Sequence, residues 1–155
     1  TRPAASEAAA PLTEAELHAR TEILLEAYGM SINIEAMTML NMAKRQILPT
    51  CIEFSSVLGN AVGAVSSAGV EAGPQKELLE SVCGLIAAMR NDISELEKTT
   101  AKAKTLTDTV KQARLYRDEV IPSMQGLRAT ADELEAIVDA DLWPIPTYAE
   151  MLFVR

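Results

Sequence analysis

The sequence predicts an all-α protein, a long antiparallel helical bundle of three long helices followed by a short docking tail at the C-terminus. Hydrophobic residues make up 48% of the 155 residues but aromatic residues only 4%, a balance that favours packed helices over strands. Apolar residues also recur at spacings of three and four along most of the chain, the period of one helix face. This length suits one domain with a buried core.

The first long helix has a marked start and an uncertain middle. Residues 1–12 are mostly Ala, Pro and Ser, so we expect a disordered linker ahead of a helical bundle domain at 13–141. A capping box at Thr13–Glu16 begins the helix. The helical pattern runs to about residue 48, where Pro49 must kink or break it, because its ring removes a hydrogen-bond donor. A second piece then ends at Ala68-Gly69.

Two further helices complete the predicted bundle. One runs from Pro74, a favoured first position, to about residue 104, and the last spans 105–141. The last helix carries a seam at alternating spacings of four and three: Leu106, Val110, Ala113, Arg117, Val120, Met124, Leu127, Ala131, Leu134 and Val138. Arg117 is the one polar member, and Pro122 interrupts the hydrogen-bond ladder but not the seam, which predicts a kinked, continuous helix. The short connections make neighbouring helices antiparallel.

Two segments carry more apolar surface than this bundle can bury. Sixteen of the 26 residues at 23–48 are apolar and point in nearly every direction around a helix, so we expect a partner outside the chain to cover part of them. The tail at 142–155 holds three of the six aromatic residues and two prolines. The candidate packing and interface residues are therefore Tyr28, Met30, Ile34, Met37, Met39, Trp143, Pro144, Pro146, Tyr148 and Phe153.

The composition argues against several functional classes. The net charge is −8 and no basic block occurs, so neither nucleic acid nor a membrane is an expected partner. Cys51 and Cys83 lie on helical patterns and are expected to be small buried hydrophobes in a reducing cytosol. His18 is the sole histidine and is expected to face solvent, so we expect no catalytic, cofactor-binding or metal-binding residues.

Several segments match a known pattern in their order and spacing. They are Arg20-Thr-Glu-Ile-Leu-Leu-Glu-Ala-Tyr28, Ser31-Ile-Asn-Ile-Glu-Ala-Met-Thr-Met39 and Met42-Ala-Lys-Arg-Gln-Ile-Leu-Pro49, then Tyr116-Arg-Asp118, Val120-Ile-Pro122, Leu127-Arg128 and Ala131-Asp-Glu-Leu-Glu135, and finally Trp143-Pro-Ile-Pro-Thr-Tyr148 and Glu150-Met-Leu-Phe153. In these segments the chain resembles the C-terminal region of type III glutamine synthetases. The resemblance runs from about residue 20 to the end, whereas 55–105 are generic and 1–12 do not match.

The resemblance implies a longer cytoplasmic, homo-oligomeric parent enzyme that joins glutamate and ammonia using ATP and Mg or Mn. The motifs that bind those groups lie upstream in such enzymes, so this piece is expected to be non-catalytic, with a structural or assembly role. Its partners would be the parent's catalytic core and neighbouring subunits. In isolation the domain is expected to form a dimer or a domain-swapped arrangement. The alternative is a free-standing helical adaptor whose Met-rich helix binds partner helices.

Overall fold

The computed structural model describes residues 13–146 and 151–152, and the described part is all-α, as predicted. The expected linker at 1–12 and the candidates Tyr148 and Phe153 lie outside the described residues. The elements in chain order are α1 (Glu14–Met42), η1 (Ala43–Ile47), α2 (Leu48–Ser67), α3 (Gly73–Lys104), α4 (Thr109–Leu115), η2 (Tyr116–Val120) and α5 (Ile121–Glu135), where η denotes a π-helical turn.

The first three elements form one continuous helix of 54 residues, Glu14–Ser67, here called the spine. At 1.5 Å per residue it is roughly 80 Å long. The predicted capping box begins it: the Thr13 backbone N–H donates to Glu16 Oε2 (2.9 Å), and the Glu16 N–H donates to Thr13 Oγ1 (3.3 Å). At the other end, Gly69 has φ 78°, a conformation that glycine adopts without steric cost. Both predicted ends of the spine are confirmed.

The spine does not break at Pro49, so that alternative of the prediction is wrong; the kink stays a prediction. A π-helical turn at Ala43–Ile47 precedes the proline, and the Leu48 N–H donates to the Ala43 carbonyl five residues back. Pro49 is the second residue of α2. The missing N–H therefore falls where the hydrogen-bond register has already shifted from four residues to five. The helix continues past the proline because the shifted register tolerates the lost donor.

The same combination, a π-helical turn followed by a proline at the second position of the next α-helix, occurs again in the last helical segment. Tyr116–Val120 forms a π-helical turn, the Ile121 N–H donates to the Tyr116 carbonyl, and Pro122 is the second residue of α5. The predicted continuity of this segment through Pro122 is confirmed, since helical structure runs without interruption from 109 to 135.

The π-helical turn corrects the predicted seam of the last segment. Arg117 is exposed, whereas Tyr116 is almost completely buried. A π-helical turn adds one residue, so the buried row passes from Ala113 to Tyr116 instead of Arg117, and it continues at the predicted positions Val120, Leu127 and Leu134. The single polar residue of the predicted seam therefore lies beside the seam.

The last helix is also shorter than predicted, because α5 ends at Glu135 and not near 141. Turns follow, in which the Val138 N–H donates to the Leu134 carbonyl (2.8 Å) and the Asp141 N–H donates to Asp139 Oδ1 (2.9 Å). Local side-chain bonds of this kind compete with a helix. Val138 is buried as the seam predicts, but from a turn.

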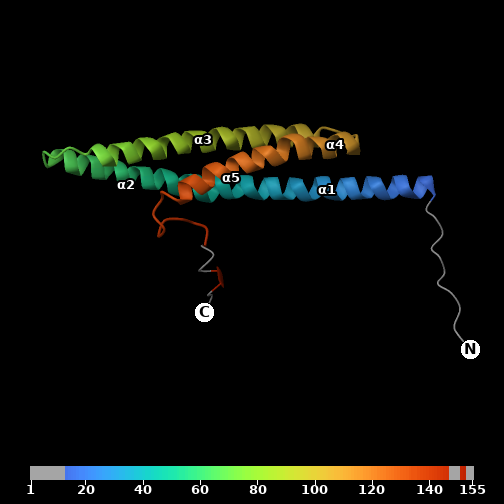
Figure 1. The fold of residues 1–155 in the computed structure, drawn as a ribbon, viewed down its shortest axis with the longest axis horizontal. Helices are drawn as coiled ribbons and strands as arrows, with labels where there is room; N and C mark the ends of the chain where they lie inside the picture. Colours follow the sequence, from blue (N-terminus) through green and yellow to red (C-terminus); the bar gives the residue numbers. More distant parts are fainter. Residues whose placement is uncertain (1–12, 147–150, 153–155) are drawn as a thin grey trace, which may run out of the picture.

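The helices pack side by side along the spine. In Figure 1, α3 runs back along α2, and the orange segment from α4 to α5 then returns beside the middle of the spine. The fully buried side chains between them include Cys51, Val82, Met89, Leu96, Val120, Leu127 and Leu134. Polar contacts join the same helices: Lys102 Nζ lies 2.6 Å from Glu119 Oε1, and the Thr130 hydroxyl donates to Asp92 Oδ2 (2.6 Å). The first turns of α1 extend beyond the α3–α4 connection (Figure 1).

Candidate interaction surfaces

One face of α1 is apolar and exposed; we call its residues Ile23, Ala27, Met30, Ile34 and Met37 the outer stripe. The four large side chains remain 64%, 61%, 64% and 47% exposed in chain order. At about 100° per residue, these four lie within roughly 60° of one another around the helix. Their spacing of four and three residues is that of a helix face that packs against another helix. No described element covers it.

The opposite face of α1 is buried against the returning segment. Gly29, Ala36 and Leu40 are buried there, and the half-buried Tyr28 and Met39 pack against the core. Five predicted interface residues of this helix therefore divide into two groups. Tyr28 and Met39 belong to the protein's own core, whereas Met30, Ile34 and Met37 face outward.

The contact between Gly29 and Tyr116 fixes how closely α1 approaches η2. A Cβ atom at position 29 would lie 3.4 Å from Tyr116 Cε2, so the ring packs directly over the glycine. The same burial raises the pKa of the Tyr116 phenol, because a phenolate would lose its hydration. The Gln112 side chain also lies here and donates to the carbonyls of Ala103 and Leu106 at the end of α3 (3.1 and 3.2 Å). This junction holds the outer stripe facing away from the bundle.

The described part of the tail begins as a packed segment. Leu142 and Trp143 donate their backbone N–H groups to the Asp139 carbonyl (3.0 Å each), and the half-buried Trp143 ring packs against the core. The indole Nε1 is buried without a hydrogen-bond partner among the described residues. Pro144 and Pro146 are exposed. Trp143 is thus partly covered by this chain's own core, whereas the two prolines present a free surface.

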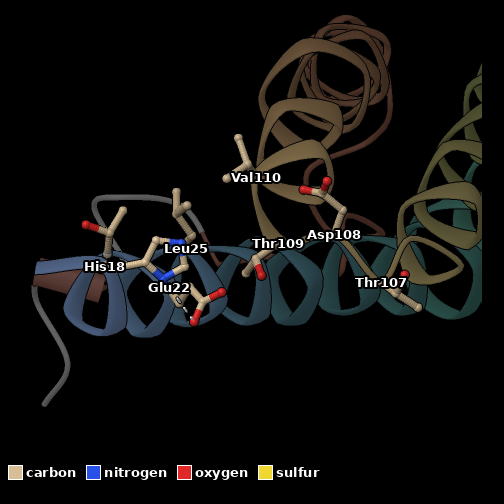
Figure 2. A pocket seen from close by; sticks show the side chains of 8 residues that line it. His18, Glu22, Leu25, Thr107, Asp108, Thr109 and Val110 are labelled. Atoms are coloured by element: carbon tan, nitrogen blue, oxygen red, sulfur yellow. Dashed lines mark ion pairs between the residues drawn. The ribbon is translucent and has the colours of Figure 1, made fainter. Parts of the chain in front are cut away.

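A groove that the sequence did not reveal lies between α1 and the start of α4. Its cavity of about 500 Å³ is lined by the first turns of α1 on one side and by residues 107–110 on the other. Figure 2 shows His18, Glu22 and Leu25 on one wall and Asp108 and Val110 on the other. His18 Nδ1 lies 3.7 Å from Glu22 Oε2, and its side chain is 75% exposed, as predicted. The two walls are more than eighty residues apart in the chain, so no local motif marks the groove.

The groove continues into an apolar hollow with a basic edge. Leu25, Tyr28, Val110 and Ala113 form the apolar lining, and Arg114 and Arg117 stand at the edge. Asp118 lies 2.6 Å from Arg117 Nε and raises the pKa of the guanidinium, which is fully charged in any case. This combination suits side-chain packing and anion contact, but it contains no nucleophile with a neighbouring base.

The reactive and metal-ligating side chains are scattered. Within 13–146 and 151–152, no three His, Cys, Asp or Glu side chains gather in a group that could hold a metal ion. Cys51 is buried as predicted, and burial raises the pKa of its thiol to about 11. Cys83 is exposed, so the prediction that it is buried is wrong.

By length and composition alone, the spine is apolar enough to cross a membrane, and only 17% of its most apolar 18-residue window is buried.

The comparisons with known proteins agree on one family. Residues 5–66 match the family model of the glutamine synthetase C-terminal domain. The chain is 33% identical over 147 residues to a glutamine synthetase of Butyrivibrio fibrisolvens and 30% identical over 154 residues to the type-3 glutamine synthetase of Dictyostelium discoideum. These alignments cover 91% and 93% of the chain but 20% of each relative. A glutamine synthetase of Bacteroides fragilis is 26% identical over 148 residues, again 20% of its length. The chain thus spans about a fifth of these relatives.

Proposed function

We propose that this chain is the helical C-terminal domain of a type-3 glutamine synthetase and that its role there is structural, because residues 5–66 match the model of that domain family and 93% of the chain aligns with the Dictyostelium discoideum enzyme. The domain packs on the catalytic core and on neighbouring subunits of the parent. The parent makes glutamine from glutamate, ammonia and ATP in the cytoplasm, as a homo-oligomer.

The proposal places the chemistry in the part of the parent that this chain does not contain. ATP and Mg or Mn would be the cofactors there. The residues described here do not fit such a site, because their metal-ligating side chains do not gather. The proposal gives no residue of this domain a catalytic role.

One observation supports the docking role above the others. The family match at 5–66 includes all of α1, and α1 is the helix whose outer stripe no described element covers. A large exposed apolar surface marks an interaction site or an aggregation hazard. The exposed polar residues Ser31 and Thr38 lie on the face of α1 beside the stripe, which suits a protein partner better than a lipid core.

The test is a truncated parent that lacks these 155 residues, compared with the intact parent by light scattering and synthetase assay. We expect loss of assembly and, with it, of activity; unchanged assembly and activity would refute the role. Synthetase activity in the excised chain would refute its non-catalytic assignment. In the intact parent, Ile34→Glu should weaken assembly, whereas Val70→Glu, at an equally exposed apolar residue after α2, should not. Flotation of the excised chain with lipid vesicles would indicate a membrane partner instead.

A further inference from the structure

We propose that the outer stripe of α1 binds a second copy of itself, with the two helices antiparallel and Met30 of one copy facing Met30 of the other. The inference rests on the proposed assembly role and names the partner for one of its surfaces. Three features of α1 carry it: the symmetry of the stripe, the charges at its two ends, and its position opposite the buried face.

The first feature is a heptad row that is apolar on both sides of Met30 and carries opposite charges at its two ends. Glu16, Ile23, Met30, Met37 and Lys44 follow one another at intervals of seven residues. When a second copy is laid antiparallel with Met30 opposite Met30, Ile23 of each copy lies opposite Met37 of the other. The outermost members, Glu16 and Lys44, then also lie opposite one another.

A second row fills the spaces between the first. Ala27 and Ile34 lie between members of the first row, which gives the alternating spacing of four and three residues of a helix pair. From Ile23 to Met37 the stripe is about 21 Å long at 1.5 Å per residue. A two-fold pairing of this kind uses the same patch on both copies and closes on itself.

The second feature is the distribution of charge along α1, which favours the antiparallel direction. Glu14, Glu16, Glu22 and Glu26 lie in the first half together with one base, Arg20, so that half is acidic, whereas Lys44 and Arg45 lie just after the end of α1. Parallel copies would place acidic ends together, whereas antiparallel copies place each acidic end against a basic one. Lys44 already contacts Glu97, but its side chain remains 43% exposed and an ammonium has three donors.

The third feature is access. Tyr28, Ile32 and Met39, which pack against the core, lie on the side of α1 roughly opposite to the outer stripe, and the buried Ala36 lies beside them. A second helix can therefore approach the stripe without displacing α4 or η2. The Gly29–Tyr116 contact keeps this orientation fixed.

The first experiment measures association of the 155-residue chain by sedimentation over a concentration series. We expect a dimer. Met30→Glu and Met30→Lys should each weaken dimerisation by at least about tenfold, because each places like charges together, and an equal mixture of the two variants should recover it. Val70→Glu is the matched control and should leave the dimer unchanged. Circular dichroism checks that every variant is folded. A folded chain that stays monomeric, or a dimer indifferent to Met30→Glu, would overturn the proposal.

The second experiment reads the direction of pairing by disulfide cross-linking in a Cys83→Ser background. Met30→Cys should cross-link with itself. Met37→Cys should not, because antiparallel copies hold the two positions about 21 Å apart. A mixture of Met37→Cys and Ile23→Cys should cross-link. Self-cross-linking of Met37→Cys would contradict the antiparallel arrangement.

The two proposals fail in different ways. If the excised chain is a folded monomer while the truncated parent loses assembly, the domain keeps its assembly role and the stripe binds the catalytic core instead. If the chain dimerises through Met30 while the truncated parent assembles normally, the pairing stands and the assembly role is wrong.

Discussion

Adding one methyl group at Gly29 tests how tightly α1 is held against the returning segment. A Cβ atom built there lies 3.4 Å from Tyr116 Cε2, 3.5 Å from Tyr116 Cδ2 and 3.6 Å from Gln112 Oε1. These separations are at the near edge of ordinary van der Waals contact, so alanine just fits. Gly84, on α3, is the matched control, because nothing lies within 4 Å of its Cβ position.

The expected magnitudes follow from these contacts. Glycine within a helix costs about 0.5–1 kcal/mol relative to alanine, so Gly84→Ala should raise the free energy of unfolding by about that amount. Gly29→Ala should raise the free energy of unfolding by at most the same amount, because the new methyl group must fit against the Tyr116 ring. Gly29→Val should instead lower the free energy of unfolding by about 1–3 kcal/mol, since its two γ-methyl groups cannot all avoid the ring.

Urea unfolding followed by circular dichroism measures all three changes. In a chain of this size, 1 kcal/mol corresponds to about 2–4 °C in Tm. A fall of more than about 1 kcal/mol for Gly29→Ala would show that Tyr116 leaves no room and that the packing is tighter than described. A gain for Gly29→Val would show that the ring does not lie over the glycine at all.

Three further results are expected. At pH 8 a thiol reagent should label Cys83 rapidly and Cys51 only on unfolding, because Cys51 is buried with its pKa raised to about 11; a Cys83→Ser variant that still labels fast would contradict this. Trp143→Ala should lower the free energy of unfolding by about 1–3 kcal/mol, less than for a fully buried ring, and Trp143→Phe by less still, because the indole N–H has no partner among the described residues. Burial raises the Tyr116 pKa above its ordinary 10, so its stabilisation is complete below pH 10 and declines as the pH rises through the raised pKa; Tyr116→Phe should remove that part of the alkaline loss in a Tm–pH series.

The ends of the spine were predictable because local chemistry decides them. Thr13 and Glu16 form a capping box that needs no distant contact, and Gly69 supplies the left-handed residue that ends the helix. The π-helical turns were not predicted. Each turn adds one residue without interrupting the apolar pattern. At the second turn the only sign of it in the sequence is that the polar Arg117 occupies a seam position while the neighbouring Tyr116 is buried.

The candidate surfaces were predictable in part. Residues 23–48 read as apolar all round, and the structure divides them into a buried face and the outer stripe. The division depends on which face of α1 the returning segment packs against, and the composition of residues 23–48 does not predict that face. The groove of Figure 2 needed the fold for the same reason, because Leu25 and Val110 meet only when the chain has turned back twice. The early end of α5 was not predicted; after it, the Asp141 N–H donates to the Asp139 side chain, whereas in a continued helix it would donate to the carbonyl of Ile137.

The π-helical turn at Ala43–Ile47 fixes how α1 is rotated about the spine axis relative to α2. Deleting one residue there would restore an ordinary helical register and leave α1 and α2 each intact. It would nevertheless rotate α1 by about 100° relative to α2 and turn the outer stripe toward a different neighbour. The extra residue of this turn therefore sets the direction in which the domain offers its uncovered face, independently of which residues make up that face.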